Sequence, residues 1–180
     1  MTRRAIVAAC ATLALTLASN PASAQIFRLT AKLSGGNETP AKITTGAFGS
    51  AECTLDLGIG GEIKCTGSVF NLPSGATVGH IHVGAVDVSG PTVCNANITP
   101  NISNDFGFTI GPCTSATITL RPNEGIRSFE DFVQAVLGEN TYVNVHSAVN
   151  PGGEVRGQLL LKPAVSAGLD YEYPTPYFGP

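Results

Sequence analysis

The sequence predicts an all-β domain, an antiparallel β-sandwich or barrel with one short helix. Three observations lead to this fold class. Val, Ile, Thr and Gly dominate over Leu, Lys and Glu, which favours strands and turns. Short segments of alternating apolar residues are separated by Gly-, Pro- and Asn-rich stretches, as in sandwiches and barrels. The length of 180 residues suits a single domain with its own core.

Each strand is predicted from apolar residues spaced by two, and each boundary from turn-forming residues. In chain order the expected strands cover 26–35, a hairpin over 51–70, 77–85, 106–110, 116–122, 141–149 and 154–162. The helix is predicted over 128–140, where Ser128 is a suitable N-cap and Asp131 follows three residues later. Its apolar stripe is Phe129, Phe132, Val133 and Val136, and Gly138 is the expected stop.

The first 24 residues are typical of a secretory signal peptide. A positive start ("MTRR") precedes an apolar stretch, and "ASA" before Gln25 matches a small-residue cleavage site. The alternative, a membrane anchor, is disfavoured because the apolar run is short and ends in Ser, Asn and Pro. We therefore expect a secreted or periplasmic protein, with a β domain at 25–162 and a flexible Pro- and Tyr-rich tail at 163–180.

Cysteine usage fits an oxidising compartment. Cleavage would remove Cys10 and leave an even number, which suggests two disulfides. The hairpin folds at a Gly-rich turn midway between Cys53 and Cys65, so these two should lie opposite each other and form one bridge. Cys94 and Cys113 then form the second bridge by elimination.

The histidines are the candidate chemistry. The chain has only three, and two of them, His80 and His82, share the segment "GHIHVG". On a strand these two side chains point to one face while Ile81 points into the core. His146 alternates with Val143 and Val145, so it lies on the outer face of its own strand. If the two strands are neighbours, three imidazoles converge, a donor set that suits copper or zinc.

Three motifs resemble the signatures of the CHRD domain, a module named after the extracellular regulator chordin and widespread in secreted bacterial proteins. They are "LSGGNETP", "GHIHVG" and "YVNVHSAVNPGGEVRGQL". The resemblance covers about Ile26 to Lys162. It implies an extracellular domain but little specific chemistry.

The same motifs are more distantly similar to copper-zinc superoxide dismutases, which have an antiparallel Greek-key fold. That resemblance implies that His80, His82 and His146 are copper ligands and that Arg156 guides an anionic substrate. No histidine is left for a bridging ligand or a zinc loop, and no cysteine lies in the last strand. The resemblance therefore implies a mononuclear site in which copper is favoured over zinc.

Glu154 and Arg156 alternate on one strand face beside this site. Glu154 is a candidate to accept an imidazole N–H, and Arg156 to attract an anion. The structural alternative is that they lock the last strand to "LSGGNETP" through Glu38.

Two functions follow. The first is metal binding with redox, superoxide-related chemistry. The second is a non-catalytic module that binds an extracellular protein or surface and uses its histidines structurally. We assign no catalytic residue, because Ser147 lacks the Gly-x-Ser-x-Gly pattern of hydrolases. The net charge of −3 argues against a nucleic-acid partner.

Overall fold

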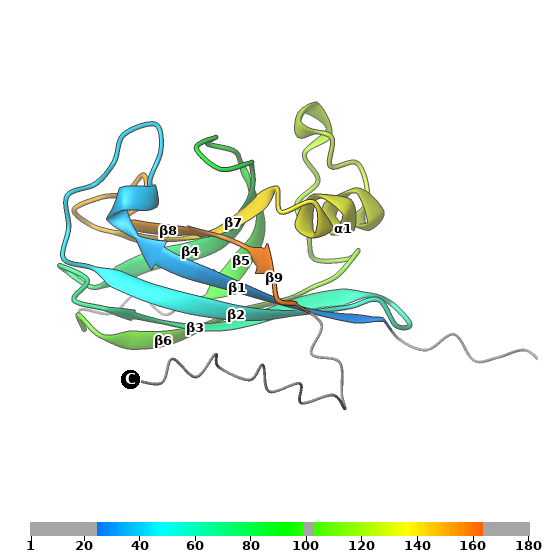
Figure 1. Cartoon of the computed structure of the whole chain (residues 1–180), viewed down its shortest axis with the longest axis horizontal. Coiled ribbons are helices and arrows are strands. Elements are labelled where there is room, and N and C mark those ends of the chain that lie inside the picture. Colours follow the sequence, from blue (N-terminus) through cyan, green and yellow to red (C-terminus); the bar gives the residue numbers. More distant parts are fainter. Residues whose placement is uncertain (1–24, 99–102, 164–180) are drawn as a thin grey trace, which may run out of the picture.

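The computed structural model describes residues 25–98 and 103–163, which form a closed antiparallel β-barrel with one short α-helix at its side (Figure 1). This confirms the predicted all-β class. The strands are β1 (Ile26–Ser34), β2 (Phe48–Asp56), β3 (Glu62–Phe70), β4 (Ala76–Val83), β5 (Thr92–Asn97), β6 (Phe106–Cys113), β7 (Thr141–Ser147), β8 (Val155–Gln158) and β9 (Leu160–Leu161). Two short 3-10 helices, η1 (Gly35–Asn37) and η2 (Pro122–Glu124), lie in the connections.

The strands close in the order β1-β2-β3-β6-β5-β4-β7-β8 and back to β1, and β9 adds to β1. Strands β4, β5 and β6 are consecutive neighbours, and β6 also lies beside the earlier strand β3. After β6 the chain returns, and β7 lies beside β4. A fourth strand that returns past a three-strand meander is the Greek-key arrangement. The Greek-key prediction is confirmed, and the arrangement makes β4 and β7 direct neighbours.

Both predicted disulfides are present. Cys53 on β2 lies directly opposite Cys65 on β3, and these cysteines are bonded. Cys94 on β5 is bonded to Cys113 at the end of β6. Each bridge therefore joins two neighbouring strands.

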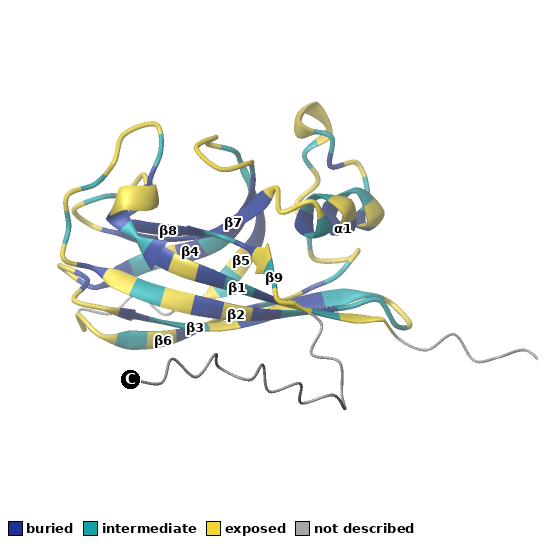
Figure 2. Ribbon diagram, in the orientation of Figure 1, coloured by how far each residue is buried: buried dark blue, intermediate teal, exposed yellow. Residues whose placement is uncertain are grey.

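The core follows the alternation of the strands. Figure 2 shows buried and exposed residues alternating along β1 and β2, as expected for strands with one face in water. Strand β7 differs, because all of its residues are buried. Its inward side chains, Val143 and Val145, join the core with Ile81 of β4. Its outward side chains, Tyr142, Asn144 and His146, are polar and are also buried.

The helix α1 (Phe129–Leu137) begins as predicted. The Ser128 side chain accepts a hydrogen bond from the Asp131 N–H at 3.1 Å. The helix also ends where predicted, because Gly138 is its C-cap. The residue in the left-handed conformation is the next one, Glu139 (φ 57°). The predicted stripe faces the core and comprises Phe129, Phe132, Val133 and Val136.

Two parts of the strand prediction are wrong. Residues 116–122 form no strand, because the hydroxyls of Thr114 and Thr117 bond to nearby backbone groups and fold the segment into a turn. Strand β5 was not predicted, since it lies in the turn-rich region 87–112 and has the weakly strand-forming sequence "TVCNAN".

The expected signal peptide (1–24) and all but the first residue of the expected tail (164–180) lie outside the described residues. Within the described part of the chain, no helix has the length and apolar character that crossing a membrane requires.

Candidate metal centre

The barrel brings the three histidines together on the outer face of two neighbouring strands. Strands β4 and β7 pair antiparallel, with Val78 opposite His146, His80 opposite Asn144 and His82 opposite Tyr142. Residues paired in this way point to the same side of the sheet. The prediction that the two histidine-bearing strands are neighbours is therefore confirmed.

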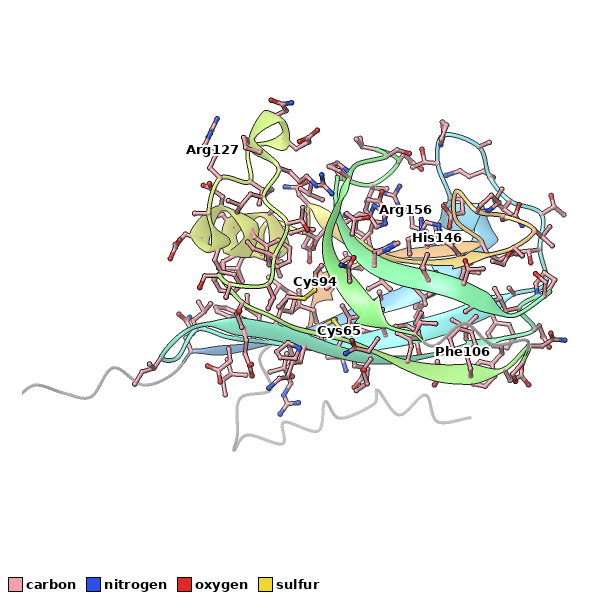
Figure 3. All side chains as sticks on the ribbon, turned by 180° about the vertical axis from the view of Figure 1, so that it is seen from behind. Cys65, Cys94, Phe106, Arg127, His146 and Arg156 are labelled. Atoms are coloured by element: carbon pink, nitrogen blue, oxygen red, sulfur yellow. A yellow bond between two sulfur atoms is a disulfide. The ribbon has the colours of Figure 1, made fainter. Side chains whose placement is uncertain are left out.

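One nitrogen from each of the three rings lies within 4.8 Å of the others. The shortest approach joins His80 Nδ1 and His146 Nε2, which are 3.2 Å apart. The ring centres of His80 and His82 are 5.3 Å apart, and those of His82 and His146 are 6.0 Å apart. His146 and the neighbouring Arg156 lie on the same side of the barrel in Figure 3, well away from Phe106.

Backbone carbonyls orient two of the rings. His82 Nδ1 lies 2.8 Å from the Gly90 oxygen, and His146 Nδ1 lies 2.9 Å from the Pro151 oxygen. A carbonyl oxygen only accepts, so each Nδ1 carries the hydrogen and each neutral ring keeps its lone pair on Nε2. His82 Nε2 is buried and has no partner among the described residues.

Burial keeps the rings neutral. It is the main cause that lowers the pKa of His80 and of His82 to about 4, and it also lowers the pKa of His146. At neutral pH each ring therefore has a nitrogen lone pair, which metal ligation requires. The lone pair of His146 Nε2 accepts a hydrogen bond from His80 Nδ1, a bond that a metal ion would replace.

Tyr142, which the sequence reasoning missed, covers one side of the cluster. Its ring stacks on His82 with centres 4.9 Å apart and planes 10° apart. Its hydroxyl donates to the Gly90 oxygen (3.2 Å) and accepts from the Gly90 N–H (3.1 Å). Tyr142 therefore supports both the ring of His82 and the carbonyl that orients it. The feature of the sequence that indicated Tyr142 was its position four residues before His146, on the same strand face.

Arg156 lies on the other side of Tyr142, because β7 lies between β4 and β8. Its Cζ is 3.4 Å from the centre of the Tyr142 ring, and its guanidinium donates to the carbonyls of Ala85 and Val88. The side chain is only 2% exposed. It thus connects the segment 84–91 to the histidine face.

Glu154 is fully buried and lies in the turn that follows β7. Its carboxylate accepts hydrogen bonds from Ser147 and Asn150, so its described partners belong to that turn and not to an imidazole. By contrast, the histidine at this end of the site, His146, has the Pro151 carbonyl as its partner.

A second buried carboxyl belongs to Glu38, for which the sequence predicts only a contact that holds the last strand. Asn144 Nδ2 lies 3.5 Å from its Oε2, while Glu38 Oε1 and Asn144 Oδ1 have no partner among the described residues. Burial raises the pKa of Glu38 to about 7, against the opposing effects of Arg156 and Asn144. It lies within the "LSGGNETP" motif, which was the available signal.

The donor set fits a transition-metal ion. Three neutral imidazoles are suitable ligands for copper or zinc, and the buried, unpartnered His82 Nε2 is a lone pair that a metal ion would satisfy. The four cysteines of the described chain are in disulfides and offer no thiolate.

Fold and site together define a class: a disulfide-bonded, all-β Greek-key barrel with a three-histidine cluster on its outer face. The chain belongs to the CHRD domain family, whose sequence model matches residues 29–159. No curated protein matches the chain, and no solved structure matches it either. The CHRD resemblance is thereby confirmed, whereas the dismutase likeness stays an interpretation of the motifs.

Proposed function

We propose that this protein is an exported CHRD domain that binds a single copper ion through His80, His82 and His146. The observation that carries the proposal is the state of the three rings. They are neutral, two of them are held by carbonyls, and one offers a buried nitrogen with no other partner. The two disulfides and the family support an oxidising, extracytoplasmic location.

Copper is preferred to zinc for two reasons. A site with nitrogen donors binds Cu(II) more tightly than the other divalent first-row ions. The cluster contains three histidines and no Asp, Glu or Cys, so it also lacks the fourth protein ligand that a structural zinc ion uses. A core and two disulfides already hold the barrel, so a metal is not needed for folding.

Each group of the site would have its own role in binding the ion. The three histidines hold the ion, the Gly90 and Pro151 carbonyls fix two of the rings, and Tyr142 shields one side. A copper ion bound there supplies one-electron redox chemistry, and superoxide is the class of substrate that the motif order suggests. Arg156 adds positive charge behind Tyr142, which favours anions near the site.

The test is a copper titration of the metal-stripped mature protein, followed by electron paramagnetic resonance. We expect one stoichiometric site with nitrogen hyperfine splitting, and at least a 100-fold loss of affinity in His80→Ala. Val78→Ala is the matched control, because Val78 lies on the same strand and face but has no ligand atom. Weak binding that is equal in all three proteins would reject the site and favour the non-catalytic binding module.

A further inference from the structure

Among the described residues, the groups that hydrogen-bond to the three histidines carry no negative charge. The two Nδ1 hydrogens go to neutral carbonyls, those of Gly90 and Pro151. In the described part of the chain, no carboxylate forms a hydrogen bond or an ion pair with any of the three rings. Metal-binding histidines often donate to carboxylates, which add electron density and negative charge. This cluster lacks that feature.

A positive charge lies close to His82. Arg156 Cζ lies 3.4 Å from the centre of the Tyr142 ring, which itself lies 4.9 Å from the centre of the His82 ring. The two separations place the guanidinium within about 8 Å of His82.

Arg156 has no close counter-ion. It is 2% exposed, and among the described residues no carboxylate oxygen lies within 4.0 Å of it. Asp87 is paired with Lys42 at 2.7 Å. Glu38 is the other carboxyl group whose charge affects Arg156. Burial raises its pKa to about 7, so at neutral pH it is only about half ionised. A positive charge therefore persists beside the cluster.

From this arrangement we propose that the three-histidine site prefers the monovalent ion Cu(I) to Cu(II), and that Arg156, acting across Tyr142, sets much of this preference. The inference rests on the proposed copper function and adds the oxidation state. Three neutral ligands cannot offset the metal's charge, so each additional unit of metal charge is repelled by the guanidinium. The guanidinium lies within about 8 Å of the His82 ring centre, and at an effective dielectric constant of about 20 a unit charge at that separation disfavours the divalent ion by roughly tenfold or more.

The experiment compares the affinities of both ions for the metal-stripped full chain. Cu(I) is titrated anaerobically with ascorbate in competition with bicinchoninate, and Cu(II) in competition with nitrilotriacetate. We expect the wild-type dissociation constant for Cu(I) to be at least tenfold smaller than that for Cu(II). This wild-type ratio decides the question even if a variant fails to fold.

Three variants test the role of Arg156. Arg156→Gln should reduce the Cu(I) preference about tenfold, and Arg156→Lys should retain most of it because the charge remains. Arg28→Gln removes an equal charge from the exposed surface of β1 and should leave the ratio unchanged.

The outcomes separate the two proposals. Equal or tighter binding of Cu(II), still dependent on the histidines, would overturn the Cu(I) preference but leave the copper site intact. Failure of both ions to bind in a histidine-dependent way would overturn the copper function itself. An unchanged ratio in a folded Arg156→Gln protein would remove Arg156 from its assigned role.

Discussion

Replacing Glu38 by Gln should make the barrel more stable at alkaline pH and leave it unchanged in acid. Burial raises the pKa of Glu38 from 4.5 to about 7 in the folded chain. Between these values the folded state keeps a proton that the unfolded state has released. The free energy of unfolding contributed by this group therefore falls as pH rises through that interval and is lost above pH 7.

The size of the effect follows from the two pKa values. One pKa unit corresponds to about 1.36 kcal/mol, so ionised Glu38 destabilises the fold by up to about 3 kcal/mol. Gln has the same shape, cannot ionise, and has an amide that can donate to the unpartnered Asn144 Oδ1. We expect Glu38→Gln to gain about 2 to 3 kcal/mol over wild type at pH 8.5 and nothing at pH 4.5.

Urea unfolding of the metal-free, disulfide-intact proteins at several pH values measures this difference. The histidines contribute equally to the free energy of unfolding of wild type and of Glu38→Gln, so their effect cancels in the difference. Glu124→Gln, on the exposed η2, is the control and should stay within about 0.5 kcal/mol of wild type at every pH. A Glu38→Gln difference that does not change between pH 4.5 and 8.5 would refute the reasoning.

Three further results are expected. Gly153→Ala should destabilise the barrel by about 2 to 3 kcal/mol in urea unfolding, because φ is 137° and a Cβ would lie 2.6 Å from Asn144 Nδ2. Gly152→Ala, where nothing lies within 4 Å, is its control, and equal losses would contradict the packing argument. Replacing either disulfide by a pair of serines should cost about 3 kcal/mol, since the bridges close loops with sequence separations of 12 and 19; a loss below about 1 kcal/mol for both pairs would show that they contribute little. In a Glu38→Gln background, the metal-free protein should lose stability as pH falls from 6.5 toward 4, because the folded histidines have lowered pKa values and the unfolded ones bind protons first. An added His80→Ala/His82→Ala pair should make that slope shallower, and an unchanged slope would assign it to other groups.

The histidine cluster could be predicted because its signal is local. Two residues spaced by two on one strand must share a face, and His146 lies in the same alternation as two core valines. The first disulfide was equally accessible, since the hairpin turn falls midway between its cysteines. These inferences need only the period of a strand and the position of a turn.

The missed features depend on contacts between distant segments. Strand β5 is held by its neighbours and by the Cys94–Cys113 bridge, although its own residues favour strands weakly. The alternation of β7 places Tyr142 on the face of His146, but its position between a histidine from β4 and an arginine from β8 depends on the pairing of three strands. The state of Glu38 likewise depends on burial beneath the turn that contains Gly153, which no periodicity reveals.

Strand β7 is buried on both faces, with valines inside and Tyr142, Asn144 and His146 outside, and this has a consequence for maturation. A slip by one residue would exchange the two faces, placing polar groups in the core and valines at the histidine cluster. His80 and His146 also lie 66 residues apart, so no short stretch of unfolded chain holds all three ligands. Correct registration of β7 and assembly of the cluster are therefore one event. Stoichiometric metal uptake would report that the barrel has closed in register, and a chain trapped before closure would stay unloaded.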